Sequence, residues 1–406
     1  MRARNVVAFL AAVIAVFSQA PGSTQVRTTV FEGARVIVGD GRPPIENATI
    51  VVNGDRFTLV GSGSTARVPA GAIHVSLAGK TVMPAIIDTH VHTSTTQPEL
   101  REDLKRRANF GVGAALSLGL DGTEAPFEQR AQTAPGLARF YLAGRGITAP
   151  EKGRTDVPYW ITAEDQARKA VQELAARKVD IVKIWVDDRN GQYPKLSPAL
   201  YTAVISEAHK HKLRVVAHIF SLEDAKGLLR AGIDAFAHGI RDRDIDDEVV
   251  ALFKARPNVV LIPNMPDRGV AVDYSWLRGS IPDGELQKIQ AGATNRPQAQ
   301  EAFGIQARNL AKLAAAGVRI AVGTDGNTPW APHVEMADMV ASGMTPAQVI
   351  VAATRNGATF VRVPNTGTIE AGHTADFIVL DANPLDDITN TRRIAAVYLR
   401  GAAVAR

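Results

Sequence analysis

Three stretches of the chain differ in how apolar and polar residues follow one another. From about residue 28 to residue 80, short apolar runs rich in valine and isoleucine alternate with turns of Gly, Asp, Asn and Pro. Short runs between such turn residues are typical of β-strands. The strands expected from this pattern cover residues 29–31, 34–38, 49–52, 56–60 and 74–77.

After Pro84 the apolar residues follow a different period. Short apolar runs now alternate with longer segments in which apolar residues recur at helical spacing. Thr162 is expected to cap one such helix, and Ser197-Pro198 has the form of another helix start. The strands expected between the helices cover residues 82–92, 113–118, 139–142, 180–185, 213–217, 234–237, 258–262 and 318–323.

This alternation of strand and helix predicts a parallel sheet, and the number of units fits a closed (β/α)8 TIM barrel. The tail of the chain returns to β patterning at residues 376–380 and 394–399. We expect the tail to pair with the N-terminal strands, so that both chain ends build one small β-sandwich domain. The predicted fold class is therefore α/β, with a TIM barrel over residues 84–358 and a β-sandwich made from residues 27–83 and 359–406.

The N-terminus has the pattern of a secretory signal peptide. Two arginines precede an apolar run at residues 6–17, and small residues around Ala20 follow it. The apolar run is too short to span a bilayer comfortably. We therefore expect residues 1–20 to be a signal peptide, the mature protein to be periplasmic or secreted, and no stable membrane insertion after the signal is removed. An uncleaved anchor is the alternative, because Pro21 is a poor residue directly after a cut at Ala20.

Composition narrows the chemistry further. The chain is 46% hydrophobic and 21% charged, which is ordinary for a globular protein, and its net charge of +5 is spread without a long basic run. A nucleic-acid partner is therefore not expected, and a small-molecule substrate is. Cysteine is absent, which excludes disulfides, thiolate metal ligands and a cysteine nucleophile. Any metal ion must bind to His, Asp, Glu or Lys.

Residues 82–92 carry the first candidate chemistry. This apolar run ends in His90 and His92, which are two positions apart and so face the same side of an extended strand. Two imidazoles placed in this way can bind one metal ion. In a (β/α)8 barrel, the active residues lie at the carboxyl ends of the strands. The ends of four further expected strands carry residues of ligand type, which are Lys183, His218, His238 and Asp325.

Each of these residues also has a structural explanation. A single histidine at a strand end often makes only local hydrogen bonds, and an aspartate between Gly-Thr and Gly, such as Asp325, often forms a turn. Lys183 could reach solvent from its strand, although a lysine in an apolar run is rarely buried without a partner. Coincidence becomes a poor explanation once all six groups fall at the ends of five expected strands.

The order of these residues resembles that of the amidohydrolase superfamily in its two-metal form. The resemblance rests on the segment Asp88-Thr-His-Val-His, followed along the chain by Lys183, two histidines and Asp325. The segment Gly367-Thr-Ile-Glu-Ala-Gly-His-Thr-Ala-Asp is similar to the family's C-terminal signature. The surroundings of Lys183, Val-Lys-Ile-Trp, look most like the branch of imidazolonepropionase-like proteins and prolidase-type dipeptidases. Imidazolonepropionases proper lack this lysine, which argues against that activity here.

The resemblance implies a site for two divalent metal ions. It implies that one ion is held by His90, His92 and Asp325, and the other by His218 and His238. Lys183, carboxylated by carbon dioxide, would bridge the two ions. Ligands without sulfur suit Zn²⁺, with Mn²⁺ or Co²⁺ as alternatives.

A hydroxide that bridges two such ions is a nucleophile at neutral pH, and Asp325 can accept its proton and return it to the leaving group. The sequence thus leads to an exported binuclear metal-dependent hydrolase of an amide, peptide or carbamate C–N bond. Two alternatives stay open: a lactonase, esterase or phosphotriesterase using the same site, and a non-catalytic binding protein on the same scaffold. Loops after the strands are expected to contact the substrate. The candidates are Asp187, Asp188, Arg189, Tyr193, Asn264, Met265, Trp330 and His333, with a structural role as the alternative for His333. A homo-oligomer is compatible with the sequence.

Overall fold

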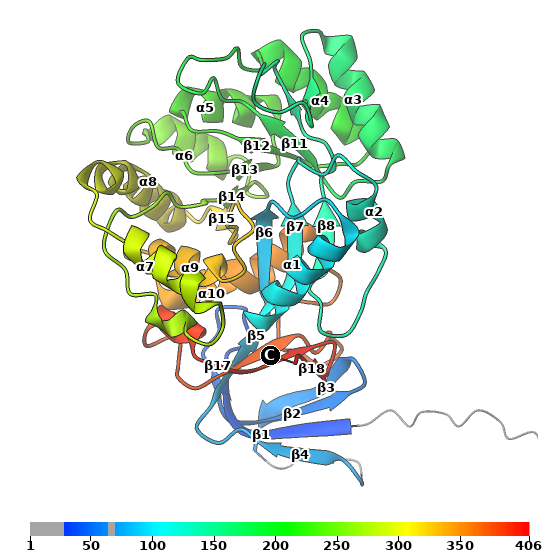
Figure 1. Cartoon of the computed structure of the whole chain (residues 1–406), viewed down its shortest axis with the longest axis vertical. Coiled ribbons are helices and arrows are strands. Elements are labelled where there is room, and N and C mark those ends of the chain that lie inside the picture. The colour runs from blue at the N-terminus through cyan, green and yellow to red at the C-terminus, as the bar shows by residue number, and fades with distance from the viewer. Residues whose placement is uncertain (1–27, 64–69, 406) are drawn as a thin grey trace, which may run out of the picture.

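The computed structural model describes residues 28–63 and 70–405 of the chain. Residues 1–20, which the sequence predicts to be a signal peptide, lie outside the described residues. Figure 1 shows two parts, a small β-sheet domain at the bottom and a larger barrel of strands and helices above it. Strands from both ends of the chain, drawn in blue and in red, lie together in the lower part (Figure 1).

Within the described residues, eight strands form the small sheet in the order β18-β17-β16-β5-β1-β2-β3, with β4 beside β1. The strands are β1 (Thr28–Val36), β2 (Ile45–Asn53), β3 (Arg56–Ser62), β4 (Ile73–Ser76), β5 (Thr81–Pro84), β16 (Phe377–Leu380), β17 (Ile394–Leu399) and β18 (Ala402–Ala403). β5 lies between β1 and β16, so an N-terminal strand pairs directly with a C-terminal one. This pairing confirms that both ends of the chain build one small domain.

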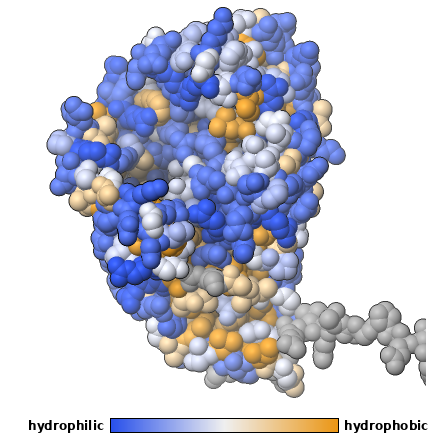
Figure 2. Space-filling view, viewed as in Figure 1, coloured by the Kyte–Doolittle hydropathy of each residue, from blue (hydrophilic) through white to orange (hydrophobic). Residues whose placement is uncertain are grey.

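The small sheet folds back over an aromatic core. Phe57 of β3 and Phe377 of β16 are far apart in the strand order, yet their ring centroids are 5.7 Å apart. Phe31 meets Phe377 edge-on at 5.2 Å, and Tyr398 stacks on Phe377 at 4.6 Å. Aromatic side chains bury large apolar areas, so this cluster stabilises the folded-back sheet. Hydrophobic residues also gather on the outer surface of this domain, whereas the barrel surface above it is mostly hydrophilic (Figure 2).

The apolar run that ends in the two histidines is divided between the two domains, which corrects the single strand that the sequence predicts. β5 ends at Pro84, and β6 (Ile86–Val91) belongs to a different sheet. Pro84 has no backbone N–H to continue a ladder. Ala85 N donates to Asp376 O of the small domain at 3.0 Å, whereas the first amide of β6 donates to Gly111 O of the barrel at 2.9 Å. The small sheet therefore leads directly into the first barrel strand.

The barrel is built from parallel strands that form two sheets within the described residues. Three strands, β6 to β8, form one sheet, and β11 to β15 form the other, with the short β9 and β10 at its edge. The bounds are β7 (Val112–Ser117), β8 (Arg139–Leu142), β9 (Ile147–Thr148), β10 (Tyr159–Trp160), β11 (Val182–Trp185), β12 (Val215–His218), β13 (Ala235–Ala237), β14 (Val260–Ile262) and β15 (Arg319–Ile320). Backbone hydrogen bonds join the two sheets, among them one from Asp180 N to Leu142 O at 3.0 Å and one from Thr89 N to Val322 O at 2.9 Å.

Helices cover the outside of the barrel (Figure 1). They are α1 (Gln97–Asn109), α2 (Ala125–Arg130), α3 (Glu164–Ala176), α4 (Pro198–Lys210), α5 (Leu222–Ala231), α6 (Asp247–Lys254), α7 (Asp283–Gly292), α8 (Pro297–Ala315), α9 (Ala331–Ala341), α10 (Pro346–Val351) and α11 (Gly357–Val361). Ser197 caps α4 as expected, because its side chain accepts a hydrogen bond from Leu200 N. Thr162 does not cap α3: Ala163 holds that position, and Thr162 donates through its amide and its hydroxyl to Gln166. No helix in the described residues is long and apolar enough to cross a bilayer.

The interior of the barrel is packed with small and branched apolar side chains. Ala114, Val216, Ala235 and Ile262 are among its almost fully buried members. A packed interior of this kind is usual for this architecture. Polar side chains near the strand ends are therefore reached from the carboxyl side of the barrel.

Candidate metal centre

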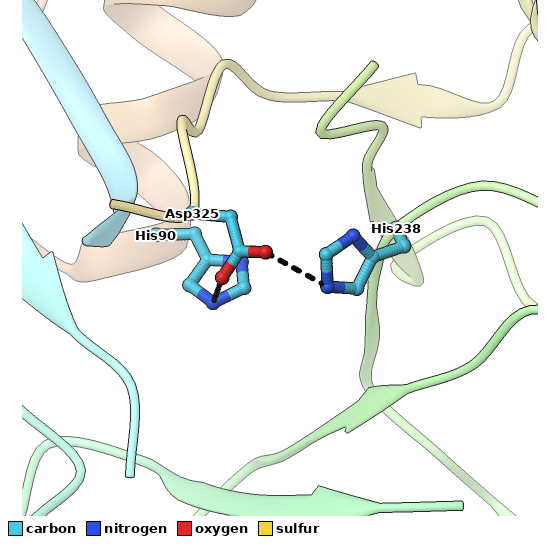
Figure 3. Close-up of side chains that lie close together, drawn as sticks. All are labelled: His90, His238 and Asp325. Atoms are coloured by element: carbon cyan, nitrogen blue, oxygen red, sulfur yellow. Dashed lines mark ion pairs between the residues drawn. The ribbon is translucent and has the colours of Figure 1, made fainter. Parts of the chain in front are cut away.

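The carboxyl end of the barrel brings together residues of ligand type from five strands. They are His90 in β6, His92 directly after β6, Lys183 in β11, His218 at the end of β12, His238 directly after β13 and Asp325 in the turn beyond β15. These are the six residues that the sequence singles out for metal binding. Figure 3 shows three of them, with the carboxylate of Asp325 facing the rings of His90 and His238.

Asp325 is the centre of the cluster. Its Oδ1 atom lies 3.1 Å from His90 Nε2 and 3.0 Å from His92 Nε2, and its Oδ2 atom lies 3.5 Å from His238 Nε2. The ring centroids of His238 and His218 are 4.3 Å apart, which adds the fourth histidine. Burial alone raises the pKa of Asp325, but the neighbouring histidines hold that pKa well below its usual range. The carboxylate is therefore anionic at neutral pH and available as a ligand.

The buried histidines of the cluster are held in the neutral form. The pKa of His90 is lowered to about 4, mainly by burial and in part by the charge of Lys183, against the opposing effect of Asp325. The pKa values of His218 and His238 are also well below the ordinary value, mainly because both rings are buried. A neutral imidazole has a free lone pair, and this is the form that binds metal ions.

Asn264 fixes the orientation of the His90 ring. Its Oδ1 atom lies 2.9 Å from His90 Nδ1 and accepts a second hydrogen bond from the backbone N–H of His238 at 3.2 Å. An amide oxygen only accepts hydrogen bonds, so Nδ1 of His90 carries the proton. The lone pair is then on Nε2, the atom that faces Asp325. Partners of this kind orient metal-binding histidines and raise their basicity.

Lys183 lies under the cluster with its ammonium group in an apolar setting. Its side chain is fully buried, and its Nζ atom has no hydrogen-bond partner among the described residues. The ring of Trp185 lies 5.2 Å from Nζ, and a Cβ atom on Gly119 would come within 2.9 Å of the lysine Cγ. Burial lowers the pKa of Lys183 to about 7, against the opposing effect of Asp325. A large fraction of this lysine is therefore a neutral amine near pH 7.

Several residues at the strand ends have left-handed backbone conformations without being glycine. The φ angles are +73° at His238, +43° at Asn264 and +54° at both Asp325 and Arg189. Such conformations cost on the order of 1 kcal/mol or more each and persist where surrounding contacts hold them. Here the backbone N–H of Asp325 donates to His90 O at 2.8 Å, which fixes the turn against β6. Strain of this kind is concentrated at functional sites.

A cavity of about 280 Å³ opens onto the cluster and is lined by His92, His218 and Asp325 together with charged loop residues. Glu151 is almost fully buried and lies 2.6 Å from Arg154 Nη1 and 3.3 Å from Arg189 Nε. Arg189 Nη1 also lies 3.2 Å from His218 Nε2. Trp185 forms an apolar part of the wall. The cavity therefore offers two guanidinium groups and an aromatic surface next to the candidate ligands.

The donor set fits divalent metal ions. Ligand atoms of His90, His238 and Asp325 all lie within 4.8 Å of one another. Nε2 of His90, Nε2 of His238 and Nζ of Lys183 are buried without a hydrogen-bond partner among the described residues, which is costly unless another group satisfies them. Imidazole nitrogens and carboxylate oxygens in such a cluster suit Zn²⁺ and similar cations.

A model of the amidohydrolase family matches residues 81–404. The chain belongs to the amidohydrolase family. Enzymes of this family are hydrolases that act on C–N bonds, and they are generally metal-dependent. The chain is therefore a hydrolase that acts on C–N bonds. The family's (β/α)8 barrel with an additional β domain is the architecture described above.

Two curated relatives and one solved structure show what this amidohydrolase is similar to. Imidazolonepropionase of Streptomyces griseus is 25% identical over 368 residues, or 85% of this chain and 89% of the relative. Ochratoxinase of Aspergillus niger is 25% identical over an alignment 429 residues long, which covers 90% of this chain and 83% of the relative. A solved structure described as a "putative prolidase from Bifidobacterium longum" superposes with a TM-score of 0.79 and 27% identity, covering 94% of this chain and 95% of its own.

Of the residues that the sequence offers as substrate contacts, Arg189 lines the cavity of this amidohydrolase, whereas Tyr193, Trp330 and His333 lie outside it. Tyr193 donates through its hydroxyl to Lys152 O at 3.3 Å and does not line the cavity. Trp330 packs with Phe110 in a separate apolar cluster. His333 is buried beside them, with Nε2 3.0 Å from Phe110 O. The structure therefore gives Trp330 and His333 a packing role, which for His333 is the structural alternative, because both lie against Phe110 and not in the cavity.

Sequence reasoning missed Glu151 and Arg154 in the cavity wall. Both lie in an irregular segment after β9, where the chain has no helical or strand period that could mark them. Arg107 was missed as well, although it is fully buried and lies 3.1 Å from Asp88. An arginine in an amphipathic helix is usually exposed, so the sequence of α1 does not indicate that Arg107 is buried. Asp88, two positions before His90, was visible as part of the motif.

Proposed function

We propose that this amidohydrolase is an exported enzyme that holds two divalent ions, with Zn²⁺ as the first choice, and hydrolyses an amide, peptide or carbamate C–N bond. The observation that carries the proposal is the buried Lys183, whose Nζ atom has no hydrogen-bond partner among the described residues. A cationic lysine in that position would repel metal ions and has no lone pair with which to bind them. A modification that turns Lys183 into an anion with oxygen ligands removes both problems.

Carboxylation of Lys183 gives the lysine a role in the centre. The neutral amine attacks carbon dioxide, a new N–C bond forms, and one proton leaves, so the product is an anion with two oxygens. The lowered pKa of about 7 supports this step, because it keeps much of the amine neutral near pH 7. His90, His92 and Asp325 would hold one ion, His218 and His238 the other, and the carboxylated lysine would be shared between them.

The protein residues around the cavity would then handle binding and proton transfer. Two bound divalent ions supply a water of lowered pKa and polarise the scissile carbonyl. Asp325 offers the carboxylate that takes up a proton and returns it to the leaving nitrogen. Arg154 and Arg189 line the cavity and both pair with Glu151, and the N–H groups that this carboxylate does not use would bind a substrate with an anionic group, such as an N-acyl amino acid or a short peptide. Trp185 offers an apolar surface to the rest of the substrate.

Metal content and a substrate screen test the proposal. Elemental analysis of protein produced with zinc should approach two equivalents per chain, and a value that stays at one despite excess zinc would contradict the bridged pair. The screen compares N-acyl amino acids, dipeptides and carbamates with esters and lactones, and hydrolysis of only the oxygen esters would contradict C–N cleavage. Asp325→Asn is the inactive control for every substrate that is turned over.

Export rests on the N-terminal pattern and has a separate test. Two arginines, the apolar run at residues 6–17 and the small residues around Ala20 support a cleaved signal peptide. N-terminal sequencing of the protein from its native host should start between residues 21 and 27 and come from the fraction outside the cytoplasm. An intact Met1 in the cytoplasmic fraction would contradict export.

A further inference from the structure

Arg107 of α1 makes an unusual buried contact with the turn that carries Asp325. Its side chain is fully buried, and Nη1 lies 3.1 Å from Asp88 Oδ2. Its Nη2 atom donates to Gly326 O at 2.8 Å, although the two residues are 219 positions apart. A guanidinium presents several N–H groups in a fixed fork, so one side chain can hold two partners in a set geometry. Arg107 therefore links β6 to the residue directly after Asp325.

The residue before Asp325 is tied to the same carboxylate. Thr324 donates through its hydroxyl to Asp88 Oδ2 at 2.8 Å. The carbonyl of Gly326 also accepts a hydrogen bond from His92 N at 3.2 Å. Both neighbours of Asp325 are thus held in place. Thr324 is bonded to Asp88 of β6, and Gly326 is bonded to His92 and to Arg107. The carboxylate between them has little freedom to turn away from the histidines.

One turn earlier on α1, Asp103 extends the same network. Its Oδ2 atom accepts hydrogen bonds from Ser94 N at 2.9 Å and from Asn327 Nδ2 at 2.8 Å. Ser94 lies in the loop after His92, and Asn327 follows Gly326 along the chain. Residues four apart lie on one face of a helix. A single face of α1 therefore contacts both loops that carry the first group of candidate ligands.

We propose that Arg107, assisted by Asp103, is a positioning residue that sets the direction of the Asp325 carboxylate. The left-handed conformation of Asp325, with φ at +54°, needs such support, because a non-glycine residue would otherwise relax out of it. This inference rests on the proposed function, in which Asp325 binds a metal ion and carries a proton. It adds that α1, on the outside of the barrel, controls both of those roles.

A purely structural role for Arg107 makes a different prediction. If the ion pair with Asp88 only fixes α1 to the barrel, loss of Arg107 lowers stability and leaves the properties of the folded site unchanged. If Arg107 positions Asp325, loss of the Gly326 contact changes the site even when the charge imbalance is removed. The zinc affinity and the kcat of the folded protein therefore separate the two roles.

The experiment compares Arg107→Met with Arg106→Met in the full chain. Arg106 is the adjacent residue on α1, with its side chain 41% exposed and its nearest acidic partner, Glu285, 3.9 Å away. Zinc alone is the first probe, with its dissociation constant measured by competition against a chelator. We expect Arg107→Met to weaken zinc binding at least 10-fold and to lower kcat about 100-fold with KM within a factor of three, since small displacements of a reacting group cost about that much. Arg106→Met should match the wild type in both.

Two further variants keep the test decisive if Arg107→Met folds poorly. Asp88→Asn combined with Arg107→Met removes both buried charges and should recover melting temperature relative to the single variant, while zinc affinity and kcat stay low. Arg107→Lys keeps a cation beside Asp88 without the fork, and it should fold while binding zinc more weakly than the wild type. Wild-type zinc affinity and kcat in the folded double variant would overturn the positioning role. If the wild type itself binds no zinc, the proposed function fails instead, so the two failures are distinguishable.

Discussion

The two halves of the candidate centre are built in different ways. In the half formed by His90, His92 and Asp325, protein groups hold the donors, since Asn264 fixes the His90 ring and Arg107 holds the turn of Asp325. In the half formed by Lys183, His218 and His238, the lysine has no hydrogen-bond partner among the described residues. His218 Nε2 lies 3.2 Å from both Asp187 Oδ2 and Arg189 Nη1, so it faces an anion and a cation at once.

This difference indicates that the first half is organised by folding and the second half by chemistry after folding. Hydrogen bonds to buried partners hold His90 and Asp325 before any ion binds. Lys183 can join the second half only after it becomes an anion. We therefore expect one ion to bind more tightly than the other. The first three predictions below each change one half while the other half serves as the reference, and the fourth changes a group outside both.

The largest effect is expected from Lys183→Ala. The variant removes the bridging anion, so it should lose the second ion and at least about three orders of magnitude of activity while the barrel still folds. Acetate or propionate should restore part of the activity by filling the vacated space, and Lys183→Arg should stay inactive because a guanidinium remains charged. Turnover, bound metal and a thermal melt check these outcomes, with the exposed Lys169→Ala as control. Full activity of Lys183→Ala without added acid would return Lys183 to a structural role.

Asn264→Ala should weaken the first half. Loss of its Oδ1 removes the acceptor for His90 Nδ1 and for His238 N, so the ring can rotate and adopt the other tautomer. Loss of such a partner typically costs 10- to 100-fold in metal affinity. Zinc titration by calorimetry should show this loss in the tighter of the two sites. Asn258→Ala, an exposed change at the opposite end of β14, is the matched control, and equal affinities for the two variants would contradict the role of Asn264.

Arg189→Met tests the second half with a smaller change. The guanidinium lies beside His218 Nε2, where a second cation is unfavourable, so its removal should raise the affinity for the weaker ion about 10-fold at low salt. The tighter ion should bind as in the wild type. Arg154→Met removes a neighbouring guanidinium that is paired with Glu151, whereas the guanidinium paired with His218 is that of Arg189, so Arg154→Met serves as the control. Tighter binding in both variants would mean that the general charge of the cavity is responsible, not the contact with His218.

The smallest effect on the metal centre itself is expected from Asp121, a buried carboxyl group outside both halves. Burial raises its pKa from 3.8 to about 7, although the Ser117 hydroxyl opposes this shift. Between these two values the folded protein keeps the proton and the unfolded chain releases it, so stability falls as pH rises from about 4 to about 7. Asp121→Asn has no carboxyl group to titrate at this position. Its free energy of unfolding relative to that of the wild type should therefore increase as the pH rises from about 4 to about 7. Urea unfolding at several pH values, with the exposed Asp283→Asn as control, measures the difference, and a pH-independent difference would contradict the shifted pKa.

Local sequence patterns predicted those parts of the molecule that depend on periodicity. The alternation of short apolar runs with helical segments indicated the barrel, and β patterning at both ends indicated the small domain. The residues at the strand ends could be selected because the architecture itself requires active residues to lie there. His90 and His92 stood out on their own, since a spacing of two places both rings on one side of a strand.

Contacts between distant segments were decided only by the tertiary structure. The run that ends in His92 divides at Ala85. The backbone N–H of Ala85 donates to Asp376 O of the small domain, whereas that of Ile86 donates to Gly111 O of the barrel. Asn264, Arg107 and Glu151 reach the site through hydrogen bonds to residues far away in the chain, and no local period records such pairs. For His333 the sequence leaves a substrate contact and a structural role open, and the fold decides for the structural role, because its ring lies against Thr391 Oγ1 and Phe110 O. The sequence determined which residues carry the chemistry, and the fold determined which neighbours control them, because burial and orientation depend on the whole chain.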